Sequence, residues 1–189
     1  FCQHVKVQDV TIVNTPEWNL TFIGCEDVLV DQIRIIGYRE NSDGIDVVST
    51  QRAVVQDCFI RTGDDAICVK AIIPGVCGGK DIICQRCIVW NDKVRCFGVA
   101  AESVENISDL IFRDCDVIRS YADWTLELGS LVVYICDHAL VENVLFENIR
   151  IEHEVHLATH VHIAKDFWAK TKEAGNIRNV IFRNIDVKP

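Results

Sequence analysis

The sequence predicts an all-β fold, a right-handed parallel β-helix of about seven rungs with about three short strands in each. One apolar pattern, with hydrophobic residues at offsets 0, 2, 5 and 7, recurs seven times. A step of two is the period of a β-strand, and the step of three marks a bend between two short strands. The seven copies begin at Val5, Val28, Ala53, Ile82, Leu110, Val144 and Val180.

Polar residues mark the bend inside these copies. Asp57, Asp114, Asn148 and Asn184 each precede the third apolar position. Asn and Asp tolerate bends and can hydrogen-bond the local backbone. A period in the twenties is typical of a solenoid, but the signature of leucine-rich repeats is absent, and ankyrin or tetratricopeptide repeats would be helical. The spacing between copies grows from 23 to 36 residues, which predicts longer loops on later rungs.

The composition is that of an ordered chain, with 49% hydrophobic residues, 3 Pro and 10 Gly. The sequence contains no run of about 18 apolar residues, so it predicts no transmembrane helix. We expect a single β-helix domain over residues 1–189. The chain has no Met and starts within a repeat, and bare solenoid ends are aggregation-prone edges. We therefore expect it to be part of a longer helix, without terminal rungs or caps.

Four of the ten cysteines fall on core positions of the pattern. Cys58, Cys87 and Cys115 share one position and Cys84 holds another, so we expect free buried thiols stacked too closely for disulfides. Zinc is not expected, because the CxxC spacing of Cys84 and Cys87 has no second pair. One bridge remains open among Cys2, Cys25, Cys77, Cys96 and Cys136.

Two short acidic motifs carry the chemistry. Asn41-Ser42-Asp43-Gly44-Ile45-Asp46 is followed by Thr62-Gly63-Asp64-Asp65. If the chain coils, Asp43 lies beside Asp64 and Asp65. Three converging carboxylates are the arrangement needed to protonate a leaving group and activate a water. The alternative is a solvated turn whose carboxylates only make bend hydrogen bonds.

A second strand column predicts what surrounds these carboxylates. Its expected inward residues are Ile45, Ile67, Val99, Leu126 and Val161. Residues beside them alternate outward, so an open face of acids and aromatics would form, which suits a carbohydrate chain. The predicted substrate-binding residues on and around this face are Asp46, Lys70, Phe97, Trp124, Glu127, His160 and His162.

Each of these residues has a plainer interpretation. Asp46 is either a substrate contact or a polar groove residue, and Lys70 either pairs with the carboxylates or lies on the surface. Phe97 and Trp124 could instead cover the sheet beneath a loop. His160 and His162 could form a metal site with His156, but no suitably placed carboxylate completes it, so we expect no metal.

The two acidic motifs, in this order and spacing, resemble the NTDG and GDD signatures of family 28 glycoside hydrolases, the polygalacturonases. Residues 14–20, Asn-Thr-Pro-Glu-Trp-Asn-Leu, also resemble the family segment before the first motif. The resemblance is sharp over about residues 10–70 and implies a pectin-lyase-like β-helix. It further implies that Asp64 is the general acid, that Asp43 and Asp65 activate water, and that the anomeric configuration inverts. Crowded carboxylates can keep one carboxyl protonated, as an acid requires.

The sequence departs from this family in two later motifs. Gly-His-Gly corresponds to Cys96-Phe97-Gly98, and the galacturonate-binding Arg-Ile-Lys falls on Thr125-Leu126-Glu127. A polyuronate needs cationic partners, and the net charge of −9 disfavours a polyanion. We therefore expect an inverting hydrolase of a neutral or only partly acidic polysaccharide or oligosaccharide. The family 49 dextranase-like enzymes are a related possibility.

Other functions remain open beside this one. A non-catalytic carbohydrate-binding or structural β-helix, such as an adhesin, would fit the lost motifs; a polysaccharide lyase fits less well, because its basic column is missing. We expect no cofactor, no nucleic acid and no membrane as partner, and the oligomeric state stays open. The expected location is secreted, extracellular or periplasmic. The segment 152–172 could form a wall that blocks one end of the groove.

Overall fold

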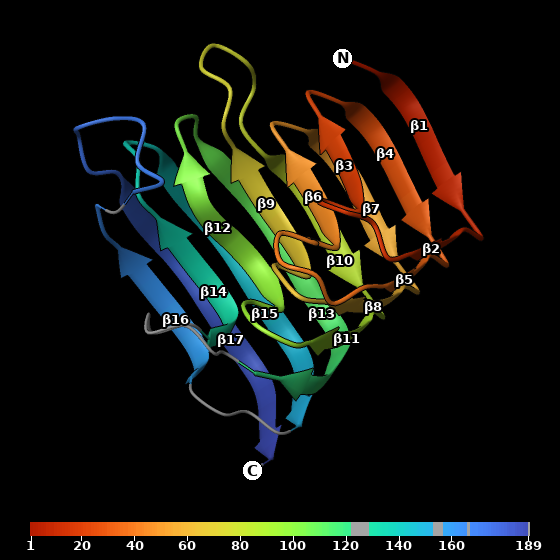
Figure 1. Ribbon diagram of the computed structural model, residues 1–189. Helices are drawn as coiled ribbons and strands as arrows, with labels where there is room; N and C mark the ends of the chain where they lie inside the picture. Colours follow the sequence, from red (N-terminus) through yellow and green to blue (C-terminus); the bar gives the residue numbers. More distant parts are fainter. Residues whose placement is uncertain (122–128, 153–156, 166, 189) are drawn as a thin grey trace.

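The computed structural model describes residues 1–121, 129–152, 157–165 and 167–188. These residues form parallel strands that coil into a β-helix, as predicted (Figure 1). The described part of the chain contains no helix, and hence none that could cross a membrane.

Two parallel sheets run along the solenoid. The six-stranded sheet has the order β16-β14-β12-β9-β6-β3. Its strands are β3 (Leu20–Ile23), β6 (Ile45–Val48), β9 (Ile67–Ala71), β12 (Phe97–Ser103), β14 (Gly129–Ile135) and β16 (Leu157–Ile163).

The eleven-stranded sheet holds the seven apolar copies. Their first halves are β1 (Gln3–Gln8), β4 (Glu26–Asp31), β7 (Gln51–Gln56) and β10 (Lys80–Gln85), and the second halves are β2 (Thr11–Val13), β5 (Arg34–Ile36), β8 (Phe59–Thr62) and β11 (Ile88–Asn91). In the last three copies the halves merge into β13 (Ile107–Ser120), β15 (Leu140–Glu152) and β17 (Asn176–Lys188). The predicted break between two strands is therefore present in the first four copies only.

The apolar copies stack in register, as the pattern predicts. Val5 pairs with Val28, and Val28 with Ala53; the same column continues through the later copies to Val180. The core is filled by side chains of these columns, including the stacked rings of Phe112, Phe146 and Phe182, whose centroids are 5.0 Å apart in each pair. Removing these side chains from water is the main favourable contribution to folding.

The predicted bend residues adopt the left-handed backbone conformation. Asp57, Asp114, Asn148 and Asn184 have φ between 52° and 55°, a region that Asn and Asp tolerate better than other side chains. A second left-handed column, which the sequence analysis did not predict, precedes the first apolar position. It consists of His4, Asp27, Arg52, Asp81, Asp109, Asn143 and Asn179.

The cysteines lie as free thiols. Cys58, Cys84, Cys87 and Cys115 are buried in the core, as predicted, and the bridge left open among the other cysteines does not form, since all ten are free.

The second column differs from its prediction beyond the second rung. Ile45 pairs with Ile67, but the next partners are Phe97, Leu131 and Thr159. Val99 and Val161 were thus placed two residues too late, and Leu126 lies outside the described residues. Phe97 and Val99 both alternate inward on β12, where they pair with Ile67 and Val69, so the pattern alone did not fix which of them continues the column of Ile45.

Candidate active site

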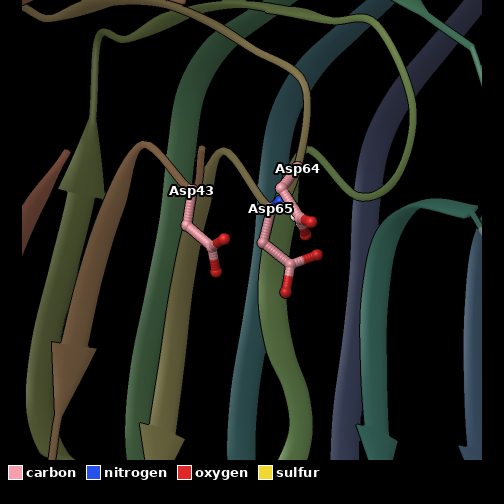
Figure 2. A group of neighbouring side chains, drawn as sticks. All are labelled: Asp43, Asp64 and Asp65. Atoms are coloured by element: carbon pink, nitrogen blue, oxygen red, sulfur yellow. Dashed lines mark hydrogen bonds between the residues drawn. The ribbon is translucent and has the colours of Figure 1, made fainter. Parts of the chain in front are cut away.

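Three carboxylates converge before the strands of the six-stranded sheet. Asp43 lies two residues before Ile45, and Asp65 two residues before Ile67, so the pairing of these two isoleucines brings the acids side by side. Asp64 adjoins them at the same turn. One carboxylate oxygen from each aspartate lies within 4.8 Å of the others (Figure 2). The convergence predicted from the two motifs is present.

The small residues of both motifs hold the two turns together. A Cβ on Gly44 would lie 2.3 Å from the carbonyl oxygen of Ala66, so only glycine permits this approach. The hydroxyl of Ser42 accepts a hydrogen bond from the Gly63 N–H at 3.2 Å, and the hydroxyl of Thr62 donates to the carbonyl of Ser42. The sequence around each aspartate therefore sets the position of the carboxylate.

Lys70, at the far end of β9, neutralises part of this charge. Its Nζ lies 2.7 Å from Asp43 Oδ2, 2.9 Å from Asp46 Oδ1 and 3.9 Å from Asp65 Oδ2. The ammonium also lies 4.2 Å from the centre of the Trp18 ring, a cation–π contact. Of the two alternatives for Lys70, pairing with the carboxylates is the one present.

Asp46 does not reach the groove, because its side chain is fully buried. Its contact with Lys70 is a charge pair rather than an aligned hydrogen bond, since neither carboxylate oxygen has a hydrogen-bond partner among the described residues. The prediction of Asp46 as a substrate contact is wrong. Asp46 instead forms an ion pair with the ammonium of Lys70.

Arg95 is a site residue that the sequence analysis missed. It lies two residues before Phe97, the position that Asp43 and Asp65 hold on the preceding rungs. Its Nη1 is 2.8 Å from Asp65 Oδ1 and 3.0 Å from Oδ2, and its guanidinium lies over the ring of Tyr134 at 5.5 Å. Counting from Phe97 rather than Val99 as the inward residue would have found it.

Phe97 is therefore not on the outer face. Its side chain is 0% exposed and its ring lies 6.1 Å from that of Phe112 in the core. The predicted sugar contact at Phe97 is wrong, because strand alternation turns this side chain inward.

Burial shifts the proton equilibria of the cluster. Burial, then the charges of Asp65 and Asp43, raise the pKa of Asp64 to about 7. Burial and Asp46 raise the pKa of Asp43 to about 8, and burial raises the pKa of Asp46 to about 7. Burial lowers the pKa of Lys70, but the three carboxylates around it outweigh this, and the net shift is upward. The ammonium therefore stays charged.

A cavity of about 440 Å³ lies over the three carboxylates. Glu17 and Trp18 line it on one side, and Glu102 and Trp168 are also among its lining residues. Trp168 follows β16, in a segment that packs on the outer face of β12 and β14 with Ala164 and Ala169. This segment lies within the predicted wall at 152–172.

Asp137 anchors that segment. Its Oδ1 accepts the backbone N–H groups of Lys170 and Thr171, both at 2.7 Å, and the Lys165 ammonium donates to the carbonyl of Cys136 at 2.6 Å. Burial raises the pKa of Asp137, but these backbone and hydroxyl donors outweigh it and hold the pKa below its ordinary value. The segment is thus tied to the end of β14.

The structure leaves four predicted residues to account for. Trp124 and Glu127 lie outside the described residues. His160 and His162 lie on β16 with ring centroids 5.1 Å apart. β16 is three strands from β9, a separation of roughly 14 Å at the strand spacing of a sheet. Neither histidine lines this cavity, and their contact with substrate stays a prediction.

The fourth rung also has different residues from those predicted. Leu131 occupies the inward position, so Ser130 and Val132 flank it in place of Thr125 and Glu127. Neither residue is cationic. The three carboxylates are close enough to share a metal ion, but Lys70 and Arg95 already supply two positive charges there, which favours proton transfer as their chemistry.

The family model of the glycosyl hydrolases family 28 matches residues 1–188. The chain belongs to this family. Among its relatives, a polygalacturonase of Chamaecyparis obtusa is 35% identical over 86 residues, which is 44% of this chain and 16% of that protein. Polygalacturonase QRT2 of Arabidopsis thaliana is 22% identical over 97% of this chain and 41% of its own length. The family 28 chain thus spans less than half the length of these relatives.

Two solved structures share the fold of this family 28 chain. An exopolygalacturonase from Thermotoga maritima superposes with a TM-score of 0.77 at 19% identity, covering 98% of this chain and 42% of that one. A polygalacturonase from Erwinia carotovora gives 0.75 at 13% identity, covering 97% and 53%. These likenesses confirm the predicted right-handed parallel β-helix.

Proposed function

We propose that this family 28 chain is an inverting glycoside hydrolase of a neutral or only partly acidic glycan. The observation that carries the proposal is the convergence of Asp43, Asp64 and Asp65 in one cavity, with cations beside two of the three. Such a set can donate a proton to a leaving oxygen and accept a proton from an attacking water.

Asp64 is the general acid in this proposal. The cluster holds four carboxyls, the buried ones of Asp43, Asp46 and Asp65 and the half-buried one of Asp64, against two cations, Lys70 and Arg95. The excess of acids favours retention of a proton, and Asp64 alone of the four makes no ion pair within the described part of the chain. Its pKa of about 7 keeps it protonated below neutral pH.

Asp43 and Asp65 activate the water. The water is held between Asp43, whose raised pKa of about 8 keeps it protonated at neutral pH, and Asp65. It attacks the anomeric carbon and loses a proton to Asp65, while the glycosidic C–O bond breaks and the leaving oxygen takes the proton of Asp64. Inverting enzymes usually separate acid and base by roughly 6.5–9.5 Å to fit the water. Here the oxygens lie within 4.8 Å, so the water has to sit above Asp43 and Asp65, on the cavity side.

The charge of the cavity favours a neutral sugar. Both lining cations, Lys70 and Arg95, are held in ion pairs with aspartates. A uronate carboxylate would meet mainly acids and would lose hydration without a free cation to replace it. The acidic residues that line the cavity are Glu17, Asp43, Asp64, Asp65 and Glu102.

The second candidate is hydrolysis of a polygalacturonate, which the names of the relatives favour. A third is binding of a glycan without cleavage. For an enzyme of extracellular polysaccharides we propose an extracellular location.

The test is reducing-end release from a panel of neutral glycans and homogalacturonan by the protein, by Asp64→Asn and by Asp114→Asn. Asp114 lies in an exposed bend whose column also holds Asn148 and Asn184, so the matched control should keep activity. The proposal is supported if the protein and Asp114→Asn cleave a neutral glycan and Asp64→Asn does not. Cleavage of homogalacturonan alone would favour the second candidate, and glycan binding without cleavage the third.

A further inference from the structure

We propose that Arg95 is a positioning residue that offsets the charge of Asp65 and orients its carboxylate for water activation. The inference rests on the proposed hydrolase function and adds a residue to it. Arg95 continues the column of Asp43 and Asp65 on the next rung, so two acidic positions are followed by a positively charged one.

Arg95 is the principal counter-ion of Asp65. One nitrogen, Nη1, contacts both carboxylate oxygens, at 2.8 and 3.0 Å, and the two side chains are 8% and 4% exposed. Lys70 is 3.9 Å from Asp65 and closer to Asp43 and Asp46. Each water-activating carboxylate thus has its own cation.

The ionisable groups around Asp65 are Asp43 before β6, Asp46 on β6, Asp64 beside it, Cys68 and Lys70 on β9, and Arg95 before β12. Three of them are carboxyls, one is a thiol and two are cations. Removal of Arg95 would leave the distant Lys70 as the only cation facing this carboxylate among the described residues.

Packing alone does not explain an arginine at this position. The Nε–H of Arg95 is buried and has no hydrogen-bond partner in the described part of the protein. Burying an unpartnered donor costs stability, so an apolar residue over Tyr134 would suit the fold better. The arginine is explained by its carboxylate partner.

A substrate carboxylate would have to compete with Asp65 for Arg95. Its Nη1 is engaged by both oxygens of Asp65, and its face lies against Tyr134. The proposal therefore predicts an effect on the chemical step rather than on substrate affinity.

The experiment compares Arg95→Met and Arg95→Lys with the protein on a glycan that it cleaves. Arg61→Met is the matched control, because Arg61 also pairs with an aspartate, Asp92 at 2.9 Å, and stacks over an aromatic ring, Trp90 at 4.9 Å, but lies outside the cavity. We expect Arg95→Met to lower kcat by about 10²-fold with KM changed less than about threefold. Its acidic pH limb should move to higher pH, because the carboxylate cluster loses one of its two cations.

Arg95→Lys should keep the acidic limb and recover part of kcat, because it keeps the charge but loses the two-oxygen contact. A folded Arg95→Met with unchanged kcat, or one whose KM alone rises, overturns the proposal. If Arg95→Met does not fold, Arg95→Lys decides, since unchanged kcat in that variant would show that the contact is not needed.

An infrared titration separates this inference from the proposed function. It counts protonated carboxyls without substrate, and Arg95→Met should show one more at neutral pH than the protein and Arg61→Met. An unchanged count contradicts the inference. An extra protonated carboxyl in a protein that cleaves no glycan would support the role of Arg95 and refute the hydrolase.

Discussion

Lys70 and Asp43 are joined across one turn of the β-helix, with Nζ 2.7 Å from Oδ2 and both side chains 4% exposed. Because Lys70 also contacts Asp46 at 2.9 Å, one ammonium offsets two buried carboxylates. Removing one partner of a buried ion pair leaves the other uncompensated, which is more damaging than removing both. The lysine therefore contributes to stability and to the charge state of the site together.

Lys70→Met should lower the free energy of unfolding by roughly 3–5 kcal/mol at pH 8 and by less at pH 5. The pKa values of Asp43 and Asp46, about 8 and about 7, are raised above the ordinary 3.8, so the stabilisation by their protonated forms is full below about pH 4 and is lost as the pH rises through 7 to 8. Denaturant unfolding at both pH values measures the difference. Lys80→Met is the exposed control, and equal losses at both pH values would contradict the argument.

The activity should fall as the pH rises through about 7. Asp64 donates its proton as the acid, and burial raises its pKa to about 7, so the active protonated form is depleted above that value. The profile of kcat/KM against pH checks this on the glycan that is cleaved. An alkaline limb unrelated to Asp64, still present in the residual activity of Asp64→Asn, would argue for another acid.

Gly44→Ala should destabilise the protein by about 1–3 kcal/mol and lower activity, because its Cβ would lie 2.3 Å from the Ala66 carbonyl oxygen and 2.7 Å from Ile60 Cγ2. That carbonyl cannot retreat freely, since it accepts the N–H of Ile45. Thermal unfolding and kcat of Gly44→Ala and Gly37→Ala form the comparison. A Cβ on Gly37 meets nothing closer than 3.8 Å, and equal effects of the two variants would refute the steric explanation.

The sequence predicted those contacts in which two residues stand at the same number of positions from the inward reference residue of their own rungs. Asp43 and Asp65 each precede their inward isoleucine by two residues, so their proximity follows from the pattern alone. Arg95 obeys the same rule but was missed, because Phe97 and Val99 both point inward and either could serve as the reference residue. The count failed where strand alternation left two candidate references.

The segment that carries Trp168 was predictable only as a long connection. Its position depends on hydrogen bonds from Lys170 and Thr171 to Asp137, more than thirty residues away, and on burial of Ala164 and Ala169 against β12 and β14. Such long-range contacts leave no periodic trace in the sequence. For the same reason the buried place of Asp46 beneath Lys70 was not foreseen.

Trp168→Ala should widen the cavity and shift cleavage toward internal bonds of a long glycan, because the indole lines the cavity beside Glu102. Product length over time measures this shift. Phe167→Ala is the matched control, since Phe167 is the neighbouring aromatic residue but is 71% exposed. If Trp168→Ala leaves the product pattern unchanged while the fold is intact, the segment is not a wall for substrate.

The stereochemistry of the first product tests the placement of water. Oxygens of Asp43, Asp64 and Asp65 lie within 4.8 Å of one another, a separation nearer to the roughly 5–5.5 Å of retaining enzymes than to the roughly 6.5–9.5 Å of inverting ones. Inversion is still expected, because Lys70 and Arg95 hold Asp43 and Asp65 from the sides and leave the cavity face free for water. Proton NMR of the anomeric signal, recorded before mutarotation, distinguishes the outcomes. A retained configuration would mean that one of these carboxylates attacks the sugar directly.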